Sequence, residues 1–336
     1  MNGARESMGA RWRRRAITLP AYGVALGALG LLAPLLLPVV AGIDLITDRR
    51  FPRTRCVCFA CVYLVCEVAG LVASAVLWLG RPFWSRERWL ARHYALQTAW
   101  ARTLFRAASR LFGFRTEVTG EEAVGGGPLL VLIRHASVAD TLLPAVFITG
   151  RHGLRLRYVL KRELLWDPCL DVVGQRLPNL FVRRDGADTA REIAAVRALA
   201  AGLAPTEGVL VYPEGTRFTS AKQARRLAQI AERGDAERHE RMRALQRVLP
   251  PRLGGPLALL DACPQADVLV VAHTGFEGIE TFGDTWTGSL IGRRVRVTLW
   301  RVPRAAVPES DAERARWLDD LWGRVDAWVV AHETRA

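Results

Sequence analysis

The chain has 336 residues, half of them hydrophobic, and carries a formal net charge of +14 with a pI of about 10.6. So basic a chain is expected to bind anionic partners, and its long apolar segments favour lipid over nucleic acid, for which no recognition pattern occurs. Four of the six cysteines crowd into one apolar segment, where cysteine acts as a small hydrophobic residue. Neither a disulfide scaffold nor a metal site is therefore predicted.

An arginine-rich head, residues 1–15, is followed by residues 16–43, which carry no charge at all. This uncharged run exceeds the roughly 20 residues that cross a bilayer as a helix. A signal peptide is the competing interpretation, but the apolar run is too long for one and no convincing A-x-A cleavage pattern follows. Pro20, Pro34 and Pro38 predict a bent or re-entrant helix.

A second candidate span, residues 56–80, is apolar except for Glu67, whose partner the sequence does not reveal. The outer flanks of the two spans carry nine arginines and the loop between them carries four, which predicts a hairpin with both ends in the cytoplasm. A hairpin that dips into one leaflet is the alternative. We therefore expect a basic head and two-helix membrane anchor in residues 1–83, followed by one α/β domain in residues 84–336.

Residues 86–112 mix tryptophan, leucine and alanine with arginine, which is typical both of a helix in the lipid headgroup layer and of a helix that covers a core. Strand-like and helix-like segments alternate after this point, so we predict an α/β fold with a mostly parallel central sheet flanked by helices. The predicted strands are residues 114–120, 129–134, 154–160, 177–182, 208–212, 267–273 and 294–300. The predicted helices start at residue 140 and cover residues 185–203, 218–248 (a polar excursion) and 312–331.

His135 directly follows the buried run 129–134, and Asp140 comes five residues later. A neutral imidazole can take the proton of an alcohol that attacks a carbonyl, provided that a carboxylate holds its other nitrogen. This pair therefore predicts a general base for an alcohol supplied by the substrate. The alternative is a capping box from Ser137 to Asp140, with His135 as an ordinary loop histidine.

Three cations stand where other predicted strands end: Lys161, Arg184 and Arg217. The carboxyl ends of parallel strands meet at one edge of a sheet, so these side chains are expected near His135. Arginine suits bidentate contact with phosphate, and the three cations together predict a phosphate pocket. Lys161 and Arg184 as solvated surface charges are the alternative.

The segment 214–217 reads Glu-Gly-Thr-Arg. Gly215 lets the backbone pass close to a ligand, and Thr216 adds a hydroxyl group and an N–H. Glu214 either shapes the pocket or pairs with Arg217 to pin the loop.

These residues resemble the motifs of the glycerophospholipid acyltransferase family, which includes 1-acylglycerol-3-phosphate and lysophospholipid acyltransferases. The resemblance covers roughly residues 86–300 and comprises H-X4-D (135–140), K-x-E-L (161–164), F-x-x-R (181–184), E-G-T-R (214–217) and a proline block (249–252). The chain departs from the family at Arg134, where asparagine is frequent, and at Arg183, where asparagine or aspartate is frequent.

The resemblance implies a membrane-bound enzyme that moves a fatty acyl group from acyl-CoA or acyl-ACP to the sn-2 hydroxyl of 1-acylglycerol-3-phosphate, giving phosphatidic acid. It makes His135 the general base and Asp140 its orienting partner. It assigns substrate phosphate binding to Lys161, Arg184, Glu214, Gly215, Thr216 and Arg217. It implies no metal and no bound cofactor.

The expected partners are membrane lipids, a lysophospholipid and the acyl carrier. The alanine- and arginine-rich composition suggests a bacterium, so the predicted hairpin is expected to lie in the inner membrane with the catalytic domain in the cytoplasm. Two alternatives stay open. One is an acyltransferase acting on another lysophospholipid or on a lyso-aminolipid. The other is a non-enzymatic membrane protein that binds anionic lipid, which leaves the E-G-T-R segment unexplained.

Overall fold

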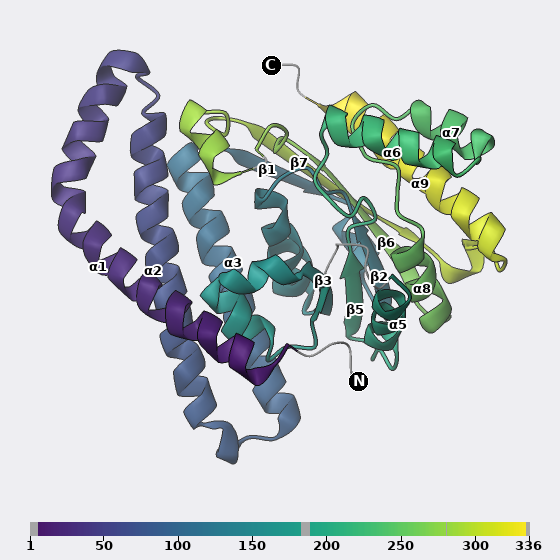
Figure 1. Cartoon of the computed structure of the whole chain (residues 1–336), viewed down its shortest axis with the longest axis horizontal. Coiled ribbons are helices and arrows are strands. Elements are labelled where there is room, and N and C mark those ends of the chain that lie inside the picture. Colours follow the sequence, from purple (N-terminus) through teal and green to yellow (C-terminus); the bar gives the residue numbers. More distant parts are fainter. Residues whose placement is uncertain (1–5, 183–188, 280, 334–336) are drawn as a thin grey trace. The chain divides into compact units, whose positions relative to one another are not determined.

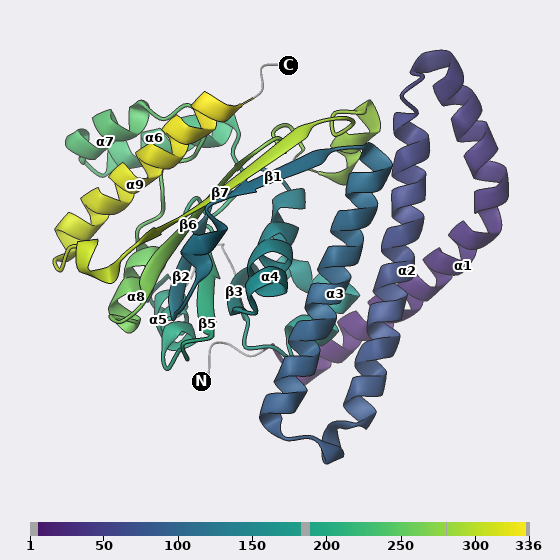
Figure 2. The same ribbon diagram turned by 180° about the vertical axis from the view of Figure 1, so that it is seen from behind.

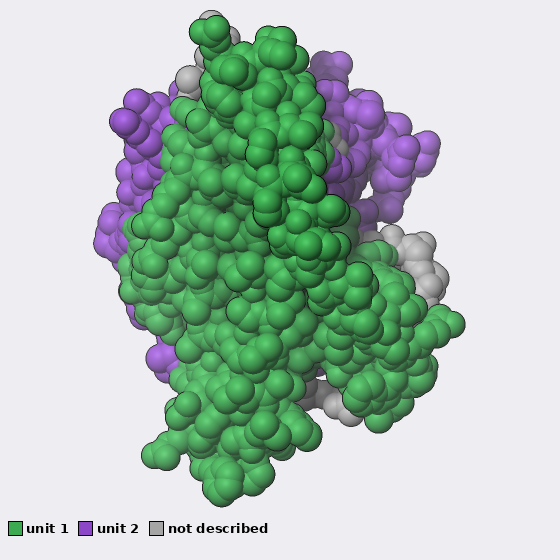
Figure 3. Space-filling model, turned by 90° about the vertical axis from the view of Figure 1, so that its left-hand side faces the viewer, with its two compact units in different colours: residues 1–114, 142–195, 283–292 green, residues 115–141, 196–282, 293–336 purple. Residues whose placement is uncertain are grey.

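The structure is a computed structural model of the chain and describes residues 6–182, 189–279 and 281–333. Its contacts group into two compact units, coloured separately in Figure 3. Unit 1 comprises Met1–Phe114, Leu142–Ala195 and Gly283–Gly292, and unit 2 comprises Arg115–Thr141, Val196–Phe282 and Arg293–Ala336. Each unit is described by itself below.

Unit 1 begins with two long helices, α1 (Met8–Thr47) and α2 (Pro52–Leu79), which lie side by side (Figures 1 and 2). Both are long and apolar enough to cross a membrane, and few of their apolar residues are buried. Helix α1 is continuous through its three prolines, and Figure 1 shows it as a bent rod, as the prolines predict. By length and composition alone, the two helices are therefore candidate membrane spans.

Residues 8–15 of the arginine-rich head belong to α1 and are partly buried. Arg14 donates from Nη2 to Asp171 Oδ1 at 2.8 Å, and Arg15 donates from Nε to Asp171 Oδ2 at 3.0 Å. Arg14 also pairs with Glu6, so Glu6 and Asp171 together balance the charges of Arg14 and Arg15. Two of the nine flanking arginines therefore do not contribute fully to an attraction for anionic lipid.

Glu67, which the sequence left without a partner, ties α2 to its neighbours. Its Oε1 accepts a hydrogen bond from Trp100 Nε1 at 2.9 Å, and its Oε2 accepts one from the backbone N–H of Cys169 at 3.3 Å. Trp100 belongs to α3 (Arg86–Phe112), which packs along α2. A polar group in an apolar helix is satisfied here by protein contacts, as burial requires.

Helix α3 is capped by Ser85 and Gly113 and buries one face, which includes Tyr94, Leu104 and Phe105. Phe105 makes edge contacts with Phe114 and Phe147. This face of the helix covers a core, in agreement with one of the two interpretations of residues 86–112.

The rest of unit 1 contains a parallel strand pair and short helical segments. Strands β3 (Arg155–Lys161) and β4 (Leu180–Val182) pair with Lys161 opposite Val182. The helix predicted from residue 140 is broken into the turns Ala139–Leu142, Pro144–Thr149 and Gly150–His152. Pro144, which lacks an N–H, and Gly150 explain why one regular helix does not form.

Unit 2 is built on five strands in the order β1-β7-β6-β2-β5. Their bounds are Arg115–Thr119 for β1, Leu129–Ile133 for β2, Glu207–Val211 for β5, Asp267–Thr274 for β6 and Arg294–Val302 for β7. The pairs β1–β7, β2–β6 and β2–β5 are parallel, whereas β6–β7 is antiparallel. Every residue of β2 is buried, as expected of a strand with neighbours on both sides and helices over its faces.

Five helices complete the described fold: α5 (Thr189–Ala200), α6 (Ser220–Glu232), α7 (Ala236–Arg243), α8 (Gly254–Ala262) and α9 (Asp311–His332). In unit 2, α8 packs against β2 and α9 against β6, and α6, α7 and α9 lie together (Figures 1 and 2). The predicted polar excursion is thus a helix pair interrupted at Gly234, whose φ is +75°. The α/β fold with a mostly parallel sheet, flanking helices and two apolar N-terminal helices is confirmed.

Candidate active site

His135 lies at the start of a tight turn that follows the central strand β2. His135 Nδ1 lies 3.1 Å from Asp140 Oδ1 and 3.3 Å from Oδ2. The His135 side chain is 13% exposed and that of Asp140 is fully buried. Since Asp140 engages Nδ1, Nε2 is the nitrogen left to accept a proton.

Asp140 also organises the backbone of this turn. Its Oδ2 accepts hydrogen bonds from the N–H groups of Ala136 and Ser137, both at 2.7 Å. Burial raises the pKa of this carboxyl, but the charge and hydrogen bond of His135, with the N–H of Ser137, lower it below its usual value. The carboxylate therefore stays ionised. Asp140 contacts both the backbone N–H groups of the turn and the His135 ring, so its capping and orienting interpretations are compatible.

Glu214 fastens the E-G-T-R loop to the His135 turn. Its Oε1 accepts from the His135 N–H at 2.8 Å and its Oε2 accepts from the Leu249 N–H at 2.9 Å. Phe218 N–H donates to His135 O at 3.1 Å, so both backbone groups of His135 are held by this loop. Burial raises the pKa of Glu214 to about 8, although the two N–H groups oppose that shift. Glu214 thus pins the loop through two backbone amides.

Gly215 is required by the shape of the loop. Its φ is +72°, and a Cβ there would lie 2.8 Å from Arg252 Nε and 2.9 Å from Arg252 Cδ. Tyr212, before the loop, places its ring at a centroid distance of 4.4 Å from the His135 ring, with the two planes tilted by 42°. The sequence predicts Tyr212 at the end of the strand before the loop and Arg252 in the proline block, but it gives neither side chain a role at the loop.

Gly215→Ala is expected to lower the free energy of unfolding by about 1–3 kcal/mol, because it adds backbone strain and crowds Arg252. Thermal unfolding in detergent measures this loss. Gly234→Ala is the matched control, since Gly234 also has a positive φ but has open space where a Cβ would stand. Equal losses in the two variants would show that contact with Arg252 contributes nothing.

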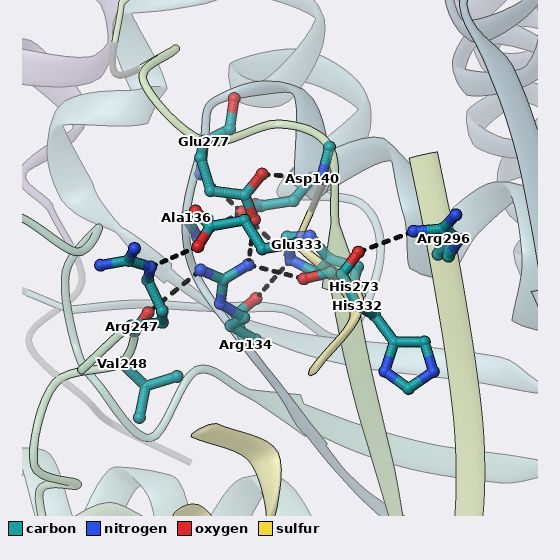
Figure 4. Close-up of polar contacts among 12 residues, drawn as sticks. Arg134, Ala136, Asp140, Arg247, Val248, His273, Glu277, Arg296, His332 and Glu333 are labelled. Atoms are coloured by element: carbon teal, nitrogen blue, oxygen red, sulfur yellow. Dashed lines mark hydrogen bonds and ion pairs between the residues drawn. The ribbon is translucent and has the colours of Figure 1, made fainter. Parts of the chain in front are cut away.

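A buried ionic cluster supports the turn from β6 (Figure 4). Arg134 is fully buried, and its Nη1 donates to His273 O and to Glu277 Oε1, both at 2.6 Å. Its Nη2 donates to Arg247 O at 3.0 Å. His273 Nε2 lies 3.0 Å from Arg134 O and 3.5 Å from Asp140 Oδ2. Arg134, which stands where the family that the motifs resemble frequently has asparagine, therefore holds His273 next to Asp140.

The ionisation states in this cluster follow from burial and charge. Burial, helped by the Arg134 charge, lowers the pKa of His273 against the pull of Asp140, so its imidazole is neutral at pH 7. A neutral His273 then donates from Nε2 to Arg134 O. Burial would raise the pKa of Glu277, but Arg134 lowers it below its usual value. Arg134 and Glu277 thus form a charged pair beside a neutral histidine.

The structure brings five of the eight predicted site residues beside His135 or into its loop, all in unit 2. They are Asp140, Glu214, Gly215, Thr216 and Arg217. Thr216 and Arg217 are half-buried. Lys161 is half-buried at the end of β3 in unit 1, and Arg184 lies outside the described residues. The three-cation phosphate pocket remains a prediction.

Comparisons with known proteins agree with this geometry. A model of the acyltransferase family matches residues 115–254, which contain His135, Asp140 and the E-G-T-R loop. The fold is similar to the crystal structure of the 1-acyl-sn-glycerophosphate acyltransferase PlsC from Thermotoga maritima, with a TM-score of 0.51 and 14% identity. The match covers 80% of this chain and all of that one, and at this identity it shows the fold. No curated protein sequence matches.

Proposed function

Because a model of the acyltransferase family matches residues 115–254, which contain motifs that resemble those of the glycerophospholipid acyltransferases, we propose that this chain moves a fatty acyl group from an acyl thioester to the sn-2 hydroxyl of 1-acylglycerol-3-phosphate. The product is phosphatidic acid. One observation carries the proposal: the His135–Asp140 pair is held on its backbone by the E-G-T-R loop, through Glu214 and Phe218. This arrangement places the proposed general base, His135, beside the loop that carries Arg217, the proposed phosphate ligand.

The chemistry follows from the free nitrogen of His135. Nε2 takes the proton of the acceptor hydroxyl as its oxygen attacks the thioester carbonyl carbon. The tetrahedral intermediate collapses with loss of the C–S bond, and the proton passes from Nε2 to the departing thiolate. Asp140 holds Nδ1–H and stabilises the imidazolium in between. A positioned base of this kind contributes about 10²–10⁴ in rate.

The acceptor phosphate is assigned to Arg217, with Lys161 and Arg184. Two apolar helices, α1 and α2, support a location at a membrane, where acceptor and product reside. We assign the chain to a bacterial inner membrane with the catalytic domain on the cytoplasmic side. Acyl-CoA or acyl-ACP is the donor.

The test mixes detergent-purified full-length protein with a labelled acyl thioester, as acyl-CoA or acyl-ACP, and with a panel of lysolipids. We expect labelled phosphatidic acid from 1-acylglycerol-3-phosphate, and slower labelling of acceptors that lack a phosphate monoester. Equal use of a phosphate-free lyso-aminolipid would refute the assigned acceptor, and no thioester consumption with any acceptor would refute the enzyme.

A further inference from the structure

Helix α6 starts directly after the E-G-T-R loop and turns a cationic face toward it. Thr219 caps the helix by accepting from Lys222 N–H at 3.2 Å. Lys222, Arg226 and Ile230 are four residues apart and so share one face, and Ile230 is buried. Lys222 Nζ donates to Arg217 O at 3.1 Å, and Arg226 Nη2 donates to Glu214 O at 3.4 Å. The polar excursion thus places cations on the loop that holds His135.

Arg252 approaches the same loop from the proline block. Its N–H donates to Pro213 O at 2.8 Å, and its side chain lies over Gly215, where a Cβ would be 2.8 Å from Nε. Arg226 also reaches that block, because its Nη1 donates to Pro250 O at 3.2 Å. Two guanidinium groups from distant segments therefore meet at one peptide, Glu214–Gly215.

Neither guanidinium has a carboxylate partner in the described part of the chain, whereas the arginines of the neighbouring helix α7 do. The three arginines of α7 are each paired: Arg238 with Asp319 at 2.8 Å, Arg241 with Glu237 at 2.7 Å and Arg243 with Glu240 at 2.6 Å. Burial and the charges of Arg252 and Arg238 lower the pKa of Arg226 to about 10. Adjacent unpaired cations repel each other, and a bound anion would relieve that repulsion.

We infer that Arg226 and Arg252 form a second anion site, which binds the phosphate groups of the acyl-thioester carrier. The inference rests on the proposed function. In the acceptor, phosphate and reacting hydroxyl sit on adjacent carbons, so its phosphate has to bind close to His135. In a carrier, a long pantetheine arm separates the thioester from its phosphates. Arg252 is exposed, which suits a water-soluble carrier rather than a lipid embedded in a bilayer.

The test compares Arg226→Gln and Arg252→Gln with Arg225→Gln in purified full-length protein. Arg225 is an exposed arginine of the same helix with no contact to the loop among the described residues, so it serves as the control for loss of charge. Steady-state rates are measured with varied acyl-CoA at saturating 1-acylglycerol-3-phosphate, and then with varied 1-acylglycerol-3-phosphate at saturating acyl-CoA. If wild-type protein uses acyl-ACP instead, that donor is varied. Arg226→Lys, which keeps the charge, separates a charge effect from misfolding.

We expect the apparent KM for the donor to rise about tenfold in Arg226→Gln and Arg252→Gln, with the acceptor KM within twofold of wild type. Arg225→Gln should match wild type. Dephospho-CoA thioesters, which lack the 3′-phosphate, should show a smaller penalty from either substitution if that phosphate is the ligand. A raised acceptor KM instead would assign the site to the acceptor, and unchanged constants would leave the two arginines as surface charges; either result overturns the inference.

Direct binding separates this inference from the proposed function. Titration of coenzyme A, holo-ACP and inorganic phosphate into wild-type protein and into Arg252→Gln needs no turnover. If the variant binds the carrier more weakly and wild-type protein transfers no acyl group, the second anion site is supported and the proposed reaction is refuted. If every probe binds equally to wild type and to Arg252→Gln, the second anion site is refuted.

Discussion

His135→Ala is expected to reduce kcat for acyl transfer by about 10²–10⁴-fold while the protein is still produced and folded. The substitution removes the group that accepts the hydroxyl proton. His273, the other histidine beside Asp140, is fully buried and therefore cannot take the place of His135 at the substrate. Asp140→Asn should cause a comparable loss because an amide cannot stabilise the imidazolium. Initial rates with a labelled acyl thioester measure both effects.

His239→Ala is the matched control, since His239 is a half-exposed histidine of α7 with no role in the turn. Its activity should equal that of wild type. Thermal unfolding of each variant distinguishes loss of chemistry from loss of fold. A purified His135→Ala protein that retains more than a tenth of wild-type turnover would rule out His135 as the general base.

The sequence predicted the local part of this site and missed its long-range part. A fully apolar run, a histidine at its end and a carboxylate five residues later are adjacent in the chain, so their geometry follows from one strand and one turn. Glu214 was placed in the right loop, but its bonds to the amides of His135 and Leu249 depend on how three distant segments pack. Residue types alone do not encode such contacts.

Arg134 is a second residue whose long-range contacts the sequence does not predict. In the sequence, Arg134 stands out only as a departure from the family pattern. An arginine at the end of a fully buried strand must, however, hydrogen-bond to carbonyl groups or to a carboxylate. That argument requires a partner and cannot say which of the chain's acids provides it. Glu277 becomes the partner only because β6 lies beside β2 in the sheet.

Arg134→Met is expected to lower the free energy of unfolding by about 3 kcal/mol at neutral pH, because it leaves Glu277 without its buried counterion and His273 O without a donor. Arg301→Met is the control: Arg301 Nε also lies 2.6 Å from a carboxylate oxygen, of Asp267, but the Arg301 side chain is 28% exposed whereas that of Arg134 is 1% exposed. Because water reaches the Arg301 pair, we expect its loss to cost less, about 1 kcal/mol.

The pH dependence of the Arg134→Met defect identifies its cause. Arg134 lowers the folded-state pKa of Glu277, so in wild type the pair contributes stability above the unfolded pKa of the carboxyl, and this contribution is lost as the pH falls through the lower folded value. The difference in thermal stability between wild type and Arg134→Met should therefore be largest near pH 7 and shrink below about pH 4.5. Adding Glu277→Met should recover part of the loss at pH 7, because the double variant buries no unpaired charge. A defect that is the same at all pH values and is not relieved by Glu277→Met would mean that Arg134 acts through packing and its carbonyl contacts rather than through its charge.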